Sequence, residues 1–372
     1  MKKTLWISSG EVSGDLQAGA ILSALRQQDP EICAIGMGGD HLAGAGQENL
    51  FRIEELSVMG IAETIASLPH ILKLLRRIRL SLEERRPDAV LLVDAPEFNF
   101  RVAKMAHRLG IPAYYFIPPK VWAWRTGRVK FLKKYVRRIF SILPFEEQFY
   151  RRHGIDVEYV GNPLVDMVDY ESISAISPVP WRIGLMPGSR RKEIESLMPV
   201  FAGAAARVLK KFPGAEFHCI RSSNFTEQTL RSLWRADVPL HMVDNGDRYR
   251  FMRTCSLMLA ASGTATLETG LAGVPTIVAY KLSPLTFAIA RRFVKIRWAS
   301  LSNLILDREI FPEHLQEKAS PELLAARMEE WLSDPSLLSS IASGLEELRS
   351  RCGEKGSAQR AAKALWKELA AL

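Results

Sequence analysis

The chain alternates short apolar runs with longer stretches in which apolar residues recur every three or four positions. Short runs bounded by turn residues, such as 4–8 and 89–93, are typical of buried strands in parallel sheets. The predicted strands are 4–8, 32–36, 89–93, 113–117, 139–143, 157–160, 182–186, 216–220, 239–243, 257–261 and 276–280.

Helical patterns fill the gaps between these runs, for example 15–28, 99–109, 191–211 and 264–272. Such alternation predicts βαβ units, whose parallel sheets are covered by helices on both faces. Segment 171–180 is rich in serine and proline, interrupts the alternation and predicts a linker. We therefore expect two doubly wound α/β domains facing a cleft, at about 1–168 and 181–345. Residues 346–372 are predicted to form C-terminal helices that can pack back on the first domain.

Composition agrees with a folded two-domain chain. At 372 residues with 47% hydrophobic and 24% charged residues, the chain exceeds the usual size of one core. The apolar run near the N-terminus stops at Ile7, too short for a signal peptide, and no stretch reaches the about 20 apolar residues of a membrane-spanning helix. The four cysteines are far apart, which argues against a zinc site and predicts a reducing, cytoplasmic setting.

The net charge of +9 is concentrated in three basic clusters interleaved with apolar residues. This mixture suits an anionic lipid surface, whereas nucleic acid and plain solvated helix faces are the alternatives. The three clusters together favour the lipid surface. Their members are Lys73, Arg76, Arg77 and Arg79; Lys130, Lys133, Lys134, Arg137 and Arg138; and Arg291, Arg292, Lys295 and Arg297.

A carboxylate ends the predicted strand 89–93. Asp94 follows this strand directly and is itself followed by a proline turn. Ligands of open α/β sheets bind outside the carboxyl ends of the strands, so Asp94 is a candidate general base. The alternative is that Asp94 caps the helix that starts near Asn99.

A glycine-containing turn also follows the first strand, at residues 9–15. Its glycines let the backbone approach a ligand, and the helix N-terminus that follows favours anions. The spacing matches neither G-x-G-x-x-G nor a P-loop, which argues against dehydrogenases and NTPases. Candidate substrate-binding residues here are Glu11, Gly14 and Asp15, whereas helix capping by Ser13 or Asp15 is the alternative.

Two similar turns follow strands in the second half of the chain. Each joins a strand to a helix through small or hydroxyl residues, so together they favour a nucleotide diphosphate. No Asp-x-Asp motif occurs, which predicts a metal-independent enzyme that neutralises the diphosphate with amides and arginine. Glu268 lies one turn later and is a candidate ribose ligand. The candidate diphosphate ligands are Gly188, Ser189, Arg190, Ser262, Gly263 and Thr264.

Taken in order, several segments resemble the lipid A disaccharide synthase family, which has the GT-B architecture of two Rossmann-like domains. The resemblance covers about residues 5–310. The matching segments are 9–15, 54–61, 93–99, 121–125, 143–146, 187–190, 262–268 and 303–304.

The resemblance implies an inverting hexosyltransferase. UDP-2,3-diacylglucosamine would donate its sugar to the 6-hydroxyl of 2,3-diacylglucosamine 1-phosphate. The N-terminal domain would bind the acceptor and lipid, and the C-terminal domain would bind the UDP-sugar. Asp94 would be the base, Arg190 and 262–264 would bind the diphosphate, and Asn303 matches a position implicated in activity. No cofactor, metal or nucleic acid is expected. The enzyme would lie peripherally on the cytoplasmic face of the inner membrane, and a homo-oligomer is compatible with the sequence.

Three alternatives and several ambiguous segments stay open. Another GT-B transferase for peptidoglycan or glycolipids, a UDP-sugar 2-epimerase and a non-enzymatic UDP-sugar sensor share the phosphate-binding half. Residues 61–82 are predicted to take up acyl chains or to pack on the sheet, and Trp122 and Trp124 either stack on substrate or fill the core. The chain departs from the family pattern at Gln17, Asn162, Ser302 and 117–120.

Overall fold

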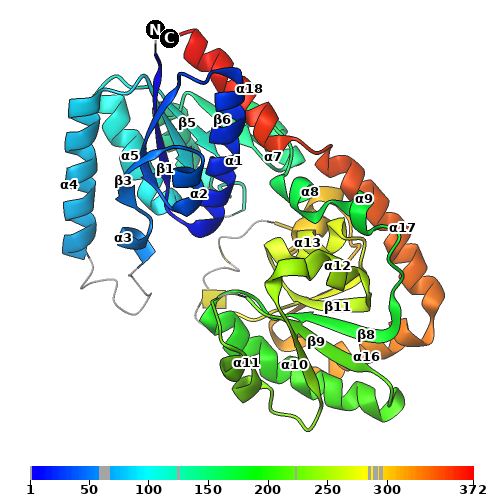
Figure 1. Ribbon diagram of the computed structural model, residues 1–372. Helices are drawn as coiled ribbons and strands as arrows, with labels where there is room; N and C mark the ends of the chain where they lie inside the picture. Colours follow the sequence, from blue (N-terminus) through cyan, green and yellow to red (C-terminus); the bar gives the residue numbers. More distant parts are fainter. Residues whose placement is uncertain are drawn as a thin grey trace. The chain divides into compact units, whose positions relative to one another are not determined.

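A computed structural model of the chain describes residues 2–57, 68–123, 126–222, 224–283, 286–287, 292 and 296–372. The chain forms two compact units. The first unit contains residues 1–163 and 354–372, and the second contains residues 164–353. Each unit is built around one parallel sheet (Figure 1).

The first unit has a seven-stranded sheet in the order β3-β2-β1-β4-β5-β6-β7. The order reverses between β1 and β4, and the register pairs Leu5 with Ala89 and Ser9 with Val93. The carboxyl ends of these two central strands are therefore level with each other. The strands are β1 Thr4–Ser9, β2 Cys33–Gly38, β3 Glu48–Arg52, β4 Ala89–Val93, β5 Ala113–Phe116, β6 Arg138–Ser141 and β7 Val157–Tyr159.

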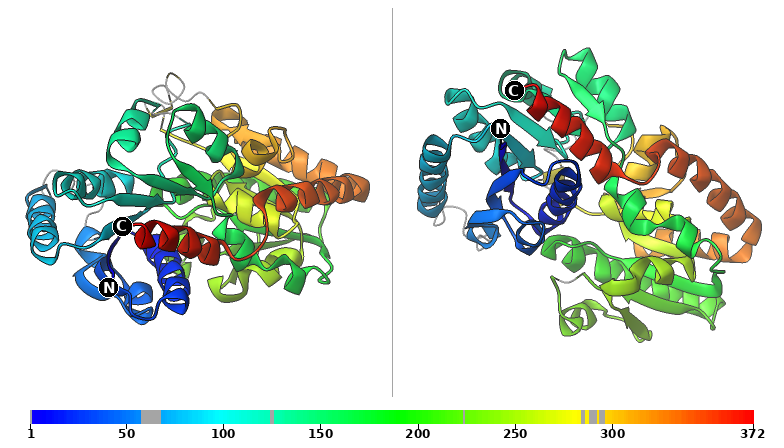
Figure 2. Two further views of the ribbon diagram at one scale, coloured as in Figure 1. Left: turned by 90° about the horizontal axis from the view of Figure 1, so that it is seen from above. Right: turned by 45° about the horizontal axis from the view of Figure 1, so that its top comes forward.

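Helices cover both faces of this sheet because alternate strand residues point to opposite sides. Trp6, Val90 and Leu92 face one hydrophobic cluster, and Leu5 and Leu91 face the other. The first cluster includes residues of α4 and α5, and the second includes residues of α1 and α18. Helices α1 and α18 lie side by side in all three ribbon views (Figures 1 and 2). The helices are α1 Val12–Gln28, α2 Asp40–Gly44, α3 Glu54–Ser57, α4 Leu68–Arg85, α5 Pro96–Arg108, η2 Thr126–Arg128, α6 Val129–Tyr135, α7 Pro144–Arg152 and α18 Ser357–Ala370.

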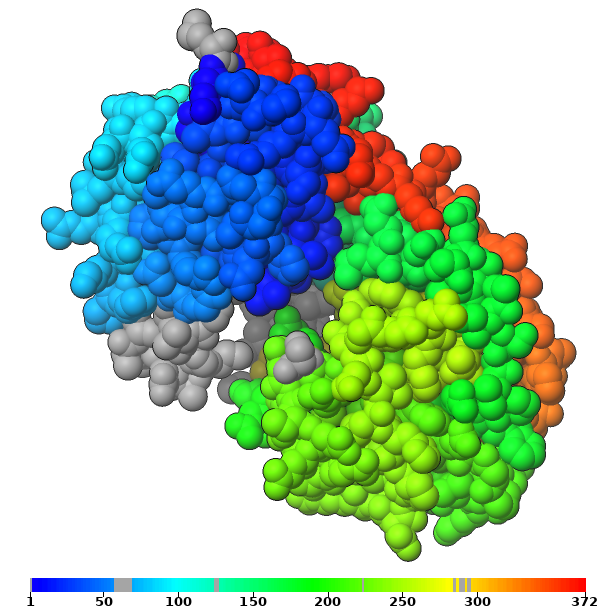
Figure 3. All heavy atoms as spheres, in the orientation of Figure 1, coloured from blue at the N-terminus to red at the C-terminus, as the bar shows by residue number. Residues whose placement is uncertain are grey.

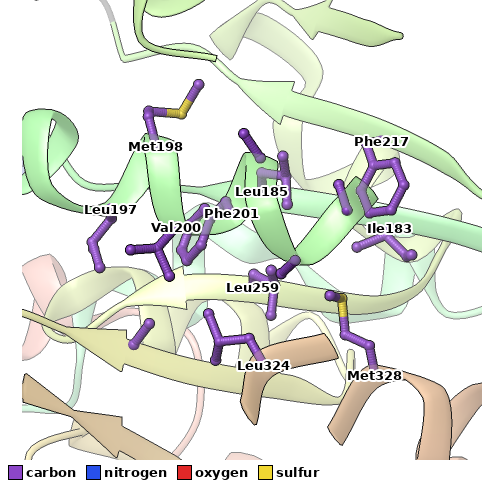
Figure 4. Packing of buried hydrophobic residues seen from close by; sticks show 14 of the residues in the cluster. Ile183, Leu185, Leu197, Met198, Val200, Phe201, Phe217, Leu259, Leu324 and Met328 are labelled. Atoms are coloured by element: carbon purple, nitrogen blue, oxygen red, sulfur yellow. The ribbon is translucent and has the colours of Figure 1, made fainter. Parts of the chain in front are cut away.

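The second unit has a six-stranded sheet in the order β10-β9-β8-β11-β12-β13. Figure 4 shows its core, where Leu185 of β8 and Leu259 of β11 belong to one buried cluster with Phe201 of α10 and Leu324 of α16. The strands are β8 Val179–Met186, β9 Glu216–Ile220, β10 Leu240–Val243, β11 Cys255–Ala261, β12 Thr276–Tyr280 and β13 Glu313–Leu315.

The helices of the second half vary from single turns to long amphipathic helices. The short ones are α8 Pro163–Val168, α9 Tyr170–Ile173, α11 Glu227–Leu233, η3 Asn245–Asp247, α12 Arg248–Arg253, α13 Thr264–Leu271, α15 Leu301–Leu306 and η4 Gln316–Lys318. The long ones are α10 Arg191–Lys211, α16 Pro321–Ser333 and α17 Pro335–Cys352.

The predicted architecture of two doubly wound Rossmann-like sheets is confirmed. Every predicted strand is present, but the pattern missed β3 and β13. Both lie at a sheet edge, and most of their residues are partly exposed, so neither forms an apolar run. All four cysteines are free thiols, and within the described ranges no helix is long and apolar enough to cross a membrane.

Candidate functional site

The turn after β4 has an unusual backbone. Asp94 and Ala95 both have positive φ values, 50° and 43°, which non-glycine residues rarely adopt. Such strain persists only where the surroundings enforce it, and it is concentrated at functional sites. Helix α5 begins at Pro96 with Ala95 as its N-cap and no side-chain cap. The alternative that Asp94 caps this helix is therefore wrong.

Asn99 holds this turn in place. Its side chain is fully buried, and its Nδ2 lies 2.8 Å from the Asp94 carbonyl oxygen, 3.1 Å from that of Val93 and 3.2 Å from that of Ser8. Its Oδ1 accepts a hydrogen bond from Ser8 Oγ at 2.7 Å. From the neighbouring strand, the Tyr115 hydroxyl donates to the Asp94 carbonyl at 2.7 Å. One amide thus joins the ends of β1 and β4 and fixes the backbone of the candidate base.

The Asp94 side chain is partly buried, and burial raises the pKa of its carboxyl above the ordinary aspartate value. The backbone amide of Ala95 and the positive charge of Lys120 act in the opposite direction and lower this pKa. A carboxylate with a raised pKa accepts a proton more readily than an exposed one. The environment of Asp94 therefore suits a general base.

A cavity of about 450 Å³ borders this turn. Glu11 of the β1–α1 turn lines it together with residues 95–98 and Leu56 of α3. Gly14 lies against the same turn, since a Cβ there would be 3.7 Å from Asp94 Cβ and 2.9 Å from Ser9 Oγ. The structure thus brings the predicted residues Glu11 and Gly14 to Asp94, together with the unpredicted Leu56.

Asp15 has a different environment from Glu11 and Gly14. It is buried inside α1, and its carboxylate accepts hydrogen bonds from the amides of Gly39 at 2.6 Å and His41 at 2.9 Å. Asp15 therefore caps the start of α2 from a neighbouring helix. Because α1 begins at Val12 with Glu11 as its N-cap, the alternative that Ser13 or Asp15 caps α1 is wrong.

In the second unit, the two predicted turns follow neighbouring strands. β8 and β11 are paired, with Met186 opposite Ala260, so residues 187–190 and 262–264 leave the same edge of the sheet side by side. Gly263 has a φ of 131°, and the space around a Cβ built on it is open. Thr264 is the first residue of α13 and is exposed. Amides of a first helical turn have no partner within their own helix, so this edge suits an anion.

The first of these turns carries its own carboxylate. Glu193 Oε2 accepts hydrogen bonds from the amides of Ser189 and Arg190, both at 3.3 Å, and Glu193 Oε1 pairs with Arg190 Nη1 at 3.0 Å. We did not predict Glu193, although a glutamate three residues after a helix start is the spacing of a capping box. A diphosphate bound here would compete with the Glu193 carboxylate for the same hydrogen-bond donors.

Glu268 is largely buried and paired with a residue that the sequence did not indicate. Arg248 Nε donates to Glu268 Oε2 at 2.9 Å, and Arg248 Nη2 donates to the Tyr249 hydroxyl at 2.6 Å. Burial raises the pKa of the Glu268 carboxyl, while Arg248 and Tyr249 lower it. Arg248 directly follows the loop 244–247, and its hydrogen bond orients the carboxylate of Glu268, the candidate ribose ligand.

Asn303 is buried, and both its side-chain nitrogen and its side-chain oxygen form hydrogen bonds within the protein. Its Nδ2 donates to the Phe311 carbonyl at 2.8 Å and to Glu313 Oε1 at 2.9 Å, and its Oδ1 accepts from the amides of Ile310 and Phe311. Glu313 in turn accepts from the amide of Ala299, whose carbonyl accepts from Ser262 Oγ at 2.8 Å. The geometry of Asn303 therefore suits positioning of the Ser262 turn.

The departures from the family pattern and the tryptophans also have definite environments. Ser302 donates to the Thr266 carbonyl at 2.7 Å, and Asn162 donates to the Ile142 carbonyl at 3.0 Å. Trp122 donates its indole N–H to the buried Glu146 at 2.9 Å, which favours the packing alternative for this tryptophan. Trp124 lies outside the described residues. Within the described part of the chain, no group of three or more His, Cys, Asp and Glu side chains is arranged to hold a metal ion.

Two parallel Rossmann-like sheets define the GT-B class of fold, and solved structures agree. The structure of Staphylococcus aureus MnaA with UDP matches with a TM-score of 0.67 at 13% identity, covering 100% of this chain and 98% of that chain. Acinetobacter baumannii MurG matches with a TM-score of 0.60 at 12% identity, covering 99% and 100%. At such identities the likeness establishes the fold alone.

Sequence similarity establishes the family. The family model described as lipid-A-disaccharide synthetase matches residues 5–366. The lipid-A-disaccharide synthase of Myxococcus xanthus is 36% identical over 366 residues, covering 96% of each chain. That of Anaeromyxobacter dehalogenans is 38% identical over 364 residues, covering 96% of this chain and 95% of the relative. The chain belongs to the lipid-A-disaccharide synthase family.

The Asn99 amide can be tested by its effect on stability. We expect Asn99→Ala to lower the free energy of unfolding by about 2–4 kcal/mol, because it leaves buried carbonyl and hydroxyl groups without a partner, at about 1–3 kcal/mol each. Urea denaturation measures this difference. Gln27→Ala, which removes an exposed amide from α1, is the matched control and should change stability by less than about 0.5 kcal/mol. Equal effects of the two substitutions would contradict the role of Asn99.

Proposed function

We propose that this protein transfers 2,3-diacylglucosamine from its UDP derivative to the 6-hydroxyl of 2,3-diacylglucosamine 1-phosphate. The products are UDP and a β(1→6)-linked disaccharide 1-phosphate, with inversion at the anomeric carbon. Family membership over residues 5–366 supports the reaction class. The observation that carries the mechanism is the strained, hydrogen-bonded turn that holds Asp94 beside a cavity at the end of β4.

Asp94 would activate the acceptor. One Oδ of its carboxylate takes the proton of the 6-hydroxyl while the hydroxyl oxygen attacks the anomeric carbon of the donor. A proton acceptor that is held in position by the fold loses little entropy when the reaction occurs. Asn99 and Tyr115 supply this restraint through the Asp94 carbonyl, which leaves the carboxylate itself available for substrate.

The second unit would bind the donor. As the bond between the anomeric carbon and the diphosphate breaks, negative charge develops on the leaving UDP. Arg190 and the amides of the turns 187–190 and 262–264 would stabilise that charge without a metal ion. Glu268, oriented by Arg248, would accept hydrogen bonds from the ribose. Acceptor activation and donor binding are thus assigned to different units.

The acylated substrates reside in a bilayer, so we also propose peripheral contact with the cytoplasmic face of the inner membrane. In α4, Leu75 and Ile78 are buried in the sheet core, whereas Leu72 is 58% exposed beside exposed Lys73 and Arg76. Figure 3 shows α4 in cyan along one side of the first unit. Apolar and basic side chains on one open helix face favour an anionic lipid surface.

The other two basic clusters contribute less to this argument. In the second cluster, Arg137 pairs with Glu368 at 3.2 Å and Arg138 pairs with Asp156 at 2.8 Å, so both serve the packing of the first unit. The third cluster, at 291–297, lies largely outside the described residues. Lys130, Lys133 and Lys134 of the second cluster are exposed, but the proposed membrane contact is placed on α4 because an exposed leucine, Leu72, lies beside its basic residues.

Removal of the base should abolish turnover but not donor binding. We expect Asp94→Asn to lower kcat by about 10²–10⁴-fold, with unchanged UDP affinity in calorimetry. In the wild-type enzyme, activity should fall as the pH decreases through the raised pKa of Asp94, above the ordinary value of about 3.9. Asp88→Asn, at the opposite end of β4, is the control. Normal turnover by Asp94→Asn would exclude Asp94 as the base.

Removal of the arginine at the first phosphate turn should weaken UDP binding. We expect Arg190→Ala to raise the Kd for UDP by about 10- to 100-fold, since a charge-assisted hydrogen bond contributes about 1.5–3 kcal/mol. Isothermal titration calorimetry measures the difference. Arg191→Ala is the matched control, because Arg191 is 77% exposed and pairs with Glu195. Unchanged affinity in Arg190→Ala would remove Arg190 from the site.

The α4 surface can be tested on vesicles. The double substitution Lys73→Ala with Arg76→Ala should weaken binding to vesicles that contain anionic lipid by about 30-fold, at about 1 kcal/mol per basic residue. Lys363→Ala with Lys367→Ala removes two exposed charges from α18 and serves as the control. Sedimentation with vesicles of about 30% phosphatidylglycerol measures partitioning. Equal binding by both double variants would exclude α4 as the contact.

A further inference from the structure

Glu146 is a buried acidic side chain that the proposed reaction does not use. It lies in the first turn of α7 and is 1% exposed. Its Oε1 accepts a hydrogen bond from Trp122 Nε1 at 2.9 Å, and its Oε2 accepts from the Leu143 amide at 3.2 Å. Because these donors are neutral, keeping a carboxylate here costs free energy that an amide or an apolar side chain would not. The contact with the Leu143 amide caps the start of α7, whereas the contact with Trp122 reaches a segment outside this helix.

Glu146 contacts segment 117–123 together with two other residues of α7. The Tyr150 hydroxyl, one helical turn further along, donates to the Pro119 carbonyl at 3.1 Å. The Trp122 ring also packs edge-on against Phe145, with ring centroids 4.8 Å apart. The anchored segment therefore has two fixed points, Pro119 and Trp122, both held by the same helix.

This segment starts beside the catalytic turn. β5 pairs with β4, with Phe116 opposite Val93, and the Asp94 amide donates to the Phe116 carbonyl at 3.2 Å. Ile117 then has a positive φ of 56°, which turns the chain sharply away from the strand end. Lys120 lies between the two anchored residues, and its positive charge acts on both Asp94 and Glu146.

We propose that Glu146 is a positioning residue that, through Trp122, fixes segment 117–123 and so keeps Lys120 where its positive charge acts on the base Asp94. This inference rests on the proposed function, because Lys120 acts on the reaction only if Asp94 is the base. A displaced Lys120 would leave the charge of the base without its neighbouring cation. Small displacements of this kind cost up to about 10²-fold in rate.

The anchor should respond to pH. Burial raises the pKa of Glu146 to about 7, against the opposing effects of the Trp122 indole, the amides of Leu143 and Ile142, and Lys120. Tyr150 faces Glu146 from the same helix and stays neutral because burial raises its pKa. Above pH 7 the carboxylate accepts from both donors. Below it, the protonated oxygen becomes a donor and one of these hydrogen bonds is lost.

Glu146→Gln tests the role in catalysis. We expect kcat to fall by about 10- to 100-fold, with the Kd for UDP unchanged and with the ionisation near 7 absent from the pH profile of kcat. Trp122→Phe should cause a similar loss, and the double variant should lose no more than either single variant. Glu147→Gln is the matched control, because the neighbouring Glu147 pairs with Arg151 on the exposed side of α7.

A spectroscopic readout separates this inference from the proposed function. The indole cross-peak of Trp122 in ¹H–¹⁵N spectra, identified by its loss in Trp122→Phe, should shift with a midpoint near pH 7 in the wild-type protein but not in Glu146→Gln. If the wild-type protein does not turn over the substrates, the proposed function fails, and the indole titration alone decides whether Glu146 anchors Trp122. An indole that does not titrate, or wild-type kcat in Glu146→Gln, would overturn the inference.

Discussion

The alignment of β1 with β4, closed by the Asn99 amide, is the constraint on which the first unit depends. These two strands lie where the strand order reverses, so their carboxyl ends open onto the edge where a doubly wound sheet binds ligands. Asn99 joins both ends and holds Asp94 and Ala95 in a left-handed conformation that they would not adopt alone. Strain at the turn is thus balanced by hydrogen bonds beneath it.

The second unit applies the same principle with different partners. The turns after β8 and β11 lie side by side, and each is braced from behind, the first by Glu193 and the second by the chain of hydrogen bonds through Ala299 to Glu313 and Asn303. In both units, residues that do not face the ligand hold those that would. The amide of Asn303, for example, makes all its hydrogen bonds inside the protein.

Periodicity predicted the architecture because buried parallel strands are apolar throughout, and every central strand has that signature. The edge strands β3 and β13 lack it because they are partly exposed. The alternatives that Asp94 and Asp15 cap their own local helices are wrong, because spacing along the sequence reports only on the helix nearby. Asp15 caps a different helix, and Arg248 reaches Glu268 across twenty positions. Such contacts depend on tertiary packing that no single segment of the sequence encodes.

The central claim is that the two units together form one disaccharide-forming enzyme of the lipid-A-disaccharide synthase family. The most direct test incubates the purified protein with UDP-2,3-diacylglucosamine and 2,3-diacylglucosamine 1-phosphate and identifies the products by mass spectrometry. The account predicts a tetra-acylated disaccharide monophosphate and an equal amount of UDP, formed without added metal. Hydrolysis or epimerisation of the UDP-sugar without formation of the disaccharide would contradict it.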